Sequence, residues 1–148
     1  MRFCIAGHSE SGSSNLALRL SRLYPMHDFE ALTYPLPEGE TRDLSGFDGV
    51  LLTVSLLDGP MPGTQAAIAD AVAQKKDLCG FCFTHLDVFD QSSGIKPCFK
   101  ELEEIELREL ASSYGVHDQA IPACRIALVP GCEEELKSFF GAVLQFMA

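Results

Sequence analysis

The stretch that decides the fold of this chain is Gly7-His8-Ser9-Glu10-Ser11-Gly12-Ser13-Ser14. A short apolar segment at residues 2–6 precedes it, and a run typical of a helix, Leu16-Ala17-Leu18-Arg19-Leu20, follows it. Glycine permits the tight backbone turn that joins two such elements. The stretch therefore predicts a strand, a glycine-bearing loop and a helix in direct succession.

The loop has the spacing of a Walker A motif, GxxxxGK[ST], without its lysine. Ser13 stands at the lysine position, and Ser14 keeps the hydroxyl group that ligates magnesium in that motif. Backbone amides at a helix N-terminus still attract an anion, but a triphosphate loses a charge-assisted contact of about 1.5–3 kcal/mol. Glu10 adds repulsion. The alternative interpretation, which we favour, is that the two glycines serve only the turn.

The bulk composition bounds the fold and the kind of partner. The chain has 148 residues, of which 47% are hydrophobic, and this predicts one globular domain over residues 1–148. Its net charge of −10 and its lack of any basic cluster beyond Lys75-Lys76 argue against direct DNA or RNA binding. With no signal peptide and no apolar run of about 18 residues, we expect a cytoplasmic protein that does not contact a membrane.

Strand-like and helix-like segments alternate along the chain. The alternation predicts an α/β fold, a parallel sheet of about five strands with helices on both faces in three layers. The loops that bind ligands should lie at the carboxyl ends of the strands. The expected strands are residues 2–6, 28–33, 49–54, 78–84 and 121–128, and the expected helices are 13–23, 64–74, 99–114 and 132–146. In the third helix we expect Phe99, Leu102, Ile105 and Leu110 to face inward and Glu101, Glu103, Glu104, Glu106 and Glu109 to face solvent.

Six cysteines are scattered through the chain, and we expect most of them to be buried as small apolar residues. Cys79 and Cys82 have the CxxC spacing of redox and zinc sites. They fall within a strand, however, where residues i and i+3 point to opposite faces. A redox or metal role for this pair is therefore kept only as a third hypothesis, and no metal ligands are assigned.

Three motifs of the chain belong together: Gly7-His8 followed by Gly12, residues 48–64, and Thr84-His85-Leu86-Asp87. They resemble motifs of the GTP-binding domain of elongation factor Tu and the related translation factors, and the first is similar to the first loop of that family. The match is closer in the middle, where residues 48–52 resemble the family's Asp-Gly-Ala-Ile-Leu strand and residues 58–64, Asp-Gly-Pro-Met-Pro-Gly-Thr, resemble its Asp-Gly-Pro-Met-Pro-Gln-Thr loop. Thr84-His85-Leu86-Asp87 lies at the position of the guanine-reading Asn-Lys-x-Asp. The resemblance implies a P-loop NTPase fold of the G-domain type, without the β-barrels of elongation factor Tu.

The chain also departs from the family at positions that carry its chemistry. Thr84 replaces the family's asparagine and His85 its lysine, so only Asp87 is retained. Residues 33–37, Thr-Tyr-Pro-Leu-Pro, replace the Asp-x-x-Gly turn that orients the attacking water. The first switch loop and the catalytic histidine have no counterpart. Since phosphoryl transfer depends on such groups, the resemblance implies no catalytic residue in this chain.

Together these observations predict a pseudo-GTPase that acts as a binding or regulatory module, possible partners being translation components or a second copy of the chain. The alternative is a true GTP-binding elongation-factor-type GTPase that a partner completes in trans. GTP or GDP with Mg²⁺ is the only cofactor that the motifs indicate, with weak affinity. The expected nucleotide-binding residues are Gly7, His8, Ser9, Glu10, Ser11, Gly12, Ser13, Ser14, Thr84, His85 and Asp87.

Overall fold

Five parallel strands form one sheet in the computed structural model, which describes residues 1–92, 94 and 98–148. They run in the spatial order β2-β1-β3-β4-β5. This result confirms the predicted α/β fold class. The strands are β1 (Arg2–His8), β2 (Asp28–Tyr34), β3 (Gly49–Ser55), β4 (Leu78–Thr84) and β5 (Ala123–Arg125).

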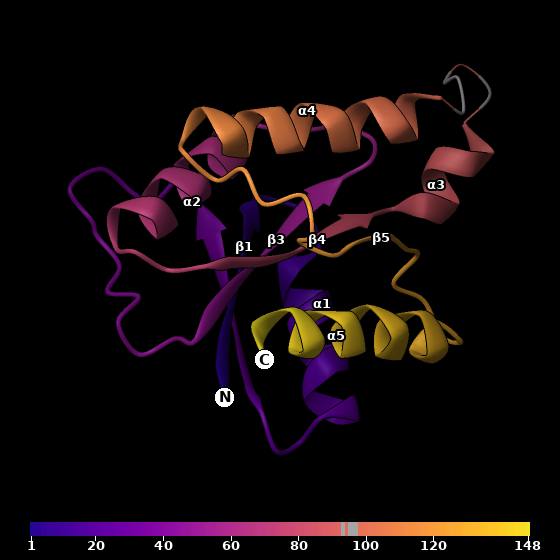
Figure 1. Ribbon diagram of the computed structural model, residues 1–148. Coiled ribbons are helices and arrows are strands. Elements are labelled where there is room, and N and C mark those ends of the chain that lie inside the picture. The colour runs from indigo at the N-terminus through magenta and orange to yellow at the C-terminus, as the bar shows by residue number, and fades with distance from the viewer. Residues whose placement is uncertain (93, 95–97) are drawn as a thin grey trace.

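The described helices cover both faces of the sheet, as Figure 1 shows, with α1 and α5 on one face and α2 and α4 on the other. They are α1 (Ser13–Leu23), α2 (Pro62–Ala73), α3 (Leu86–Gln91), α4 (Phe99–Ser113) and α5 (Glu133–Met147). Four of them agree with the predicted helices within about two residues. The short helix α3 was not predicted, because six residues are too few to establish a helical period.

Two apolar clusters fill the space between the sheet and its helices. One lies on the α2 and α4 face and includes Leu52, Phe81 and Leu107, and the other lies on the α1 and α5 face and includes Leu51, Leu136 and Phe140. All seven residues of β3 and all seven of β4 are buried. A strand that is covered on both faces has no polar alternation, which is why these two appear in the sequence as continuous apolar runs.

The prediction for the inward face of α4 was wrong. Phe99, Leu102 and Ile105 are 42%, 47% and 51% exposed, whereas Leu107 and Ala111 are buried against the sheet. Leu110, also expected to face inward, is partly buried. Apolar residues occupy two faces of this helix, and the pattern alone does not say which face meets the sheet.

Two of the five glutamates expected to face solvent on α4 are also placed differently. Glu103 and Glu104 are half-buried, and only the other three are exposed. Glu104 is turned toward the sheet because Arg108 and Arg125 lie there and pair with it. The described part of β5 is likewise shorter than the predicted strand 121–128, with three residues paired to β4.

The sheet order places the candidate loops on one edge. Successive connections lead from β1 outward to β2, and then back across β1 to β3, so the order reverses between β1 and β3. In such open parallel sheets, ligands bind outside the carboxyl ends of the strands at the point of reversal. Across the described residues, no helix combines the length and the apolarity needed to cross a membrane.

Candidate functional site

The three loops that were expected to meet do so at the carboxyl edge of the sheet. The loop after β1 contacts the start of α2, where His8 Nδ1 accepts a hydrogen bond from the Gly63 N–H at 2.9 Å. It also contacts the end of β4, where Thr84 Oγ1 donates to the Ser11 carbonyl at 2.6 Å. The predicted convergence of residues 7–14, 58–63 and 84–87 is therefore confirmed.

The backbone of the loop turns back on itself immediately after β1. The Ser11 N–H donates to the His8 carbonyl at 3.1 Å, and Glu10 has a φ of 64°. Gly12 has a φ of 92°, in the left-handed region that favours glycine. Gly7 is required for a different reason, since a Cβ there would lie 2.2 Å from both Ser11 Oγ and Thr53 Oγ1.

The side of the loop that faces the sheet is filled by the protein's own polar groups. Ser11 is 2% exposed, and its hydroxyl group is 2.8 Å from the Thr53 hydroxyl on β3. Its carbonyl is taken by Thr84. Thr84 thus braces the loop from the position at which the resemblance places an asparagine with the same bracing role. The loop is consequently held by β3 and β4, the next two strands on one side of β1 in the sheet.

The N-terminus of α1 keeps one feature of an anion site. Its first ladder bond runs from the Leu16 N–H to the Gly12 carbonyl at 2.9 Å, so the N–H groups of residues 13–15 have no acceptor among the described residues. Helix N-termini with free N–H groups favour negative charge. Ser14 is exposed beside them, but Ser13, at the lysine position, is buried. Ser9 and Glu10 are exposed. The loop therefore carries the negative charge of Glu10 and lacks the positive charge that a lysine would supply.

The guanine-reading segment is arranged differently from what the resemblance implies. His85 has a φ of 62°, and its Nδ1 lies 2.8 Å from the Ser55 hydroxyl at the end of β3. The ring is therefore held toward β3. Asp87 is half-buried in the first turn of α3. The segment thus uses Thr84 and His85 for internal contacts.

The cavities near the loop are small. The hollow bounded by the loop after β1, the end of β3 and the 58–64 segment has a volume of about 0 Å³. A second hollow of about 210 Å³ lies at the ends of β4 and β5 and is lined by Leu86, Ile126 and Cys132 among others, but not by Asp87. Larger hollows of about 450 and 480 Å³ lie at the amino ends of the strands, beside Arg2 and Lys76. The hollow between β1 and β3 is therefore much narrower than the hollows at the amino ends of the strands.

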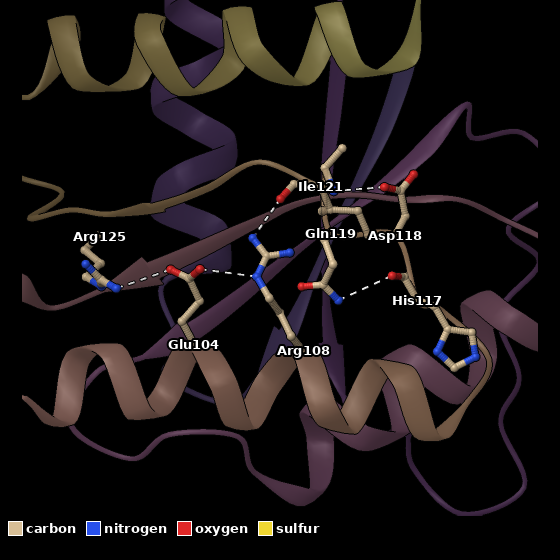
Figure 2. A network of polar contacts seen from close by, with 8 residues as sticks. Glu104, Arg108, His117, Asp118, Gln119, Ile121 and Arg125 are labelled. Carbon is tan, nitrogen blue, oxygen red and sulfur yellow. Dashed lines mark hydrogen bonds and ion pairs between the residues drawn. The ribbon is translucent and has the colours of Figure 1, made fainter.

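A charged network that the sequence analysis did not identify joins α4 to β5. Figure 2 shows Glu104 between two guanidinium groups, 3.2 Å from Arg108 Nε and 3.3 Å from Arg125 Nη2. Arg108 also donates to the Ile121 carbonyl at 2.8 Å. The i,i+4 spacing of Glu104 and Arg108 was a readable signal. Arg125 could not have been assigned to this network from the sequence, because it reaches Glu104 only when β5 pairs with β4 in the sheet.

Glu103 lies at the boundary between this network and the 58–64 loop. Burial, followed by the charges of Glu106 and Asp58, raises its pKa to about 7. Its Oε2 is buried without a hydrogen-bond partner among the described residues. Its Oε1 lies 3.4 Å from the position that a Cβ on Gly59 would occupy. The group is thus a carboxylic acid that titrates near neutral pH beside the candidate loops.

Cys79 and Cys82 do not form a joint site. The Cys79 thiol donates to the Val50 carbonyl at 3.4 Å, whereas Cys82 Sγ lies 3.7 Å from Cys124 Sγ on β5. The expectation that the two cysteines point to opposite faces of the sheet was wrong, since both lie in the cluster on the α1 and α5 face. The strand register shifts by one residue beside Cys79, which returns the two side chains to one face. Within the described part of the chain, no group of three or more His, Cys, Asp or Glu residues is arranged to hold a metal ion.

Comparisons with solved structures agree with this architecture. No protein-family model matches the chain. The translation elongation factor SelB of Methanococcus maripaludis in its apo form superposes on 98% of the chain, with a TM-score of 0.72 and 15% identity. The same factor in complex with the GTP analogue GPPNHP gives 0.69 at 15% identity and 98% of the chain. A bacterial selenocysteine-specific elongation factor, EF-Sec, gives 0.66 at 17% identity, again over 98% of the chain.

The chain spans 28–34% of the length of these three proteins. At this level of identity the comparison concerns the fold. The five-stranded parallel sheet, its helices and the loop after β1 are thus those of a translation-factor G-domain-like fold.

Proposed function

We propose that this chain is a pseudo-GTPase: a G-domain-like module, formed by residues 1–148, that binds a protein partner and does not hydrolyse GTP. The observation that carries the proposal is the narrow hollow, of about 0 Å³, between β1, β3 and the 58–64 loop. A triphosphate with its metal ion needs open space beside the loop amides. Here hydrogen bonds from Thr84 and Gly63 hold the loop in the closed form.

The lost chemistry supports the same proposal. Catalysis of phosphoryl transfer rests on a positive charge at the phosphates, a bound magnesium ion and a group that orients water. Ser13 provides no charge at the lysine position. Tyr34, in the stretch that replaces the Asp-x-x-Gly turn, is 2% exposed and donates its hydroxyl proton to Asp70 on α2 at 2.6 Å. The end of β2 therefore serves packing.

We infer that the partner is a protein, in translation or a process related to it, because the solved structures with this fold are elongation factors. The net charge of −10 disfavours direct contact with nucleic acid. Phe99, Leu102 and Ile105 form an exposed apolar stripe on α4 between glutamates, and such stripes mark protein contacts. Self-association would use the outer edge of β2, the end strand of the sheet.

Isothermal titration of the full chain with GTP, GDP and ATP, with and without Mg²⁺, tests the proposal. We expect no guanine-selective binding at micromolar concentrations. Ser13→Lys restores the missing charge, and Ser9→Lys adds the same charge at an exposed position of the same loop as a control. Selective micromolar binding of GTP or GDP by the natural chain would contradict the proposal.

A second candidate is a GTPase that a partner completes in trans by donating a lysine or arginine. It is favoured by the free N–H groups at residues 13–15 and by the bracing contact of Thr84. It predicts that Asp87→Asn shifts binding from guanine toward xanthine nucleotides when the partner is present, because the carboxylate accepts the base N–H groups. Asp90→Asn on the same helix is the control. An unchanged base preference would exclude this candidate.

A further inference from the structure

Cys82 and Cys124 are direct neighbours across the two strands at one side of the sheet. They are paired in register between β4 and β5, and their sulfur atoms are 3.7 Å apart, within the distance of a thiol–thiol hydrogen bond. Neighbouring strands lie about 4.8 Å apart, and a disulfide accepts Cα separations of about 4.4–6.8 Å. A bond between these sulfur atoms therefore requires side-chain rotation and no rearrangement of the sheet.

The other cysteines are placed less favourably for such a bond. Cys79 is turned to the Val50 carbonyl, and Cys4 lies on β1 in the cluster on the opposite face of the sheet. Cys98 is exposed at the start of α4. Cys132, at the start of α5, is buried with its sulfur 3.7 Å from Arg19 Nη1. Cys132 shares the apolar cluster of Cys82 and is therefore the competing cysteine to test.

The two thiols differ in their access to solvent. Cys124 is partly exposed, whereas Cys82 is buried. The hydrogen bond with Cys124 and burial raise the pKa of Cys82 well above its ordinary value. Only a thiolate attacks an oxidant readily. Cys124 is accordingly the residue that meets a dissolved oxidant, and Cys82 is the residue that resolves the product.

We propose that Cys82 and Cys124 are an oxidative modification site, at which a hydroperoxide converts the two thiols into a reversible intramolecular disulfide. The Cys124 thiolate attacks the peroxide, so that an S–O bond forms, the O–O bond breaks and an alcohol or water leaves. The Cys82 sulfur then attacks the resulting sulfenic acid, and water leaves with the Cys82 proton. The peroxide is reduced and two thiols are oxidised. Thiol–disulfide exchange with a small dithiol restores both cysteines.

The bond would anchor the shortest strand of the sheet. β5 has three residues, and the segment after it lies beside the candidate loop, where Leu128 accepts a hydrogen bond from Asn15 Nδ2 at 3.2 Å. The Ile126 carbonyl also accepts from the Leu86 N–H. Oxidation should therefore raise the midpoint of thermal unfolding, by about 5 °C or more, and slow amide exchange at residues 123–128.

The experiment uses the full chain, treated with hydrogen peroxide in the absence of reductant, alkylated, digested and analysed by mass spectrometry. We expect a peptide pair linked through Cys82 and Cys124 in monomeric protein, loss of two of the six free thiols, and recovery of both with dithiothreitol. Cys79→Ser is the matched control, a buried cysteine of the same strand, and should leave the link unchanged. Cys124→Ser should abolish it.

Two results would overturn the proposal. One is full alkylation of Cys82 and Cys124 at a peroxide concentration that already oxidises the exposed Cys98. The other is a link that joins either cysteine to Cys132 or to a second chain. Both outcomes are measured on the protein without substitutions, so they remain valid even if a variant folds poorly. The proposal is independent of nucleotide binding and survives the failure of the pseudo-GTPase hypothesis.

Discussion

The carboxyl edge of the sheet is held together by neutral groups on one side and by charged groups on the other. At the β1 and β3 side, hydroxyl groups and backbone carbonyls make buried hydrogen bonds, as between Ser11 and Thr53 at 2.8 Å. At the α4 and β5 side, carboxylates and guanidinium groups meet, as between Glu104 and Arg125 at 3.3 Å. The two sides lie on the same sheet and differ in the chemistry that holds their loops in place.

The two sides also differ in how many of their buried polar atoms have hydrogen-bond partners. Ser11 has partners for its hydroxyl, its carbonyl and its N–H. On the charged side, three buried atoms have no partner among the described residues: Glu103 Oε2, Arg108 Nη1 and Arg125 Nε. Neutral buried bonds depend little on pH, whereas partly buried charges do. The loop after β1 is therefore held by bonds that depend little on pH, and we expect the stability of the α4 side to depend on it.

The strongest test of the rigid side is Gly7→Ala. The added Cβ would lie 2.2 Å from Ser11 Oγ and Thr53 Oγ1 and 2.8 Å from the Thr53 carbonyl oxygen. We expect the free energy of unfolding to fall by about 3 kcal/mol, because a packed site must shift. Chemical denaturation measures it. Gly141→Ala, within α5 and with nothing within 4 Å, should be neutral or raise stability by about 1 kcal/mol. Equal effects of the two substitutions would show that the close packing around Gly7 does not determine stability.

Thr84→Val tests the brace between β4 and the loop. The hydroxyl group that donates to the Ser11 carbonyl at 2.6 Å is lost, and a buried acceptor is left without its donor. We expect a loss of about 2 kcal/mol in unfolding free energy, nearly the same at each pH, in urea unfolding curves. Thr33→Val, at an exposed position of β2, should change stability by less than about 0.5 kcal/mol. A loss at Thr84 no larger than that would mean that the brace contributes little.

Glu103→Gln tests the responsive side. Because the folded-state pKa, about 7, lies above the ordinary 4.5, the folded protein binds more protons in this window. Stability should therefore decrease as pH rises from 4.5 to about 7 and then level off.

The variant stays neutral, so it should remove most of this slope. At pH values above the window it should raise the unfolding free energy by about 1 kcal/mol, after allowance for the solvent exposure of the group. Unfolding curves at several pH values supply the measurement. Glu109→Gln, exposed on the same helix, is the control and should keep the slope. A slope that persists in Glu103→Gln would assign it to another group.

The smallest expected effect on stability is that of Leu102→Asp. The side chain is 47% exposed on α4, so we expect a change below about 0.5 kcal/mol in unfolding free energy. If the apolar stripe is the partner surface, the same change should abolish capture of that partner. Leu18→Asp, on α1 and 52% exposed, serves as the control and should leave capture intact. Equal loss in both variants would place the partner elsewhere.

Much of the architecture could be predicted because local signals and fold agree. The glycine loop, the continuous apolar runs of β3 and β4 and the strand–helix alternation each depend on short stretches of sequence. The rotation of α4 could not be predicted, since Phe99 and Leu107 are equally apolar and the choice depends on what the sheet offers opposite them. The short strand β5 and the short helix α3 were not predicted, because three and six residues are too few to show a clear periodic pattern.

The candidate site divides in the same way. The residue identities alone placed Ser13 at the lysine position of a Walker A spacing and Asp87 in a segment that resembles a guanine-reading motif. The contacts of the loop after β1 depend on the tertiary structure, because Thr53, Thr84 and Gly63 come from three other elements to bind it.

The fold class and the order of the elements could be read from the sequence, because both follow from the local pattern and the residue types. Tertiary packing is what brings Cys82 to Cys124 and Arg125 to Glu104, and it also leaves the hollow beside the loop narrow. These contacts join residues 21 to 42 positions apart, or lie between separate elements. Strand order and register bring these side chains together, and no local pattern in the sequence shows that they will be neighbours.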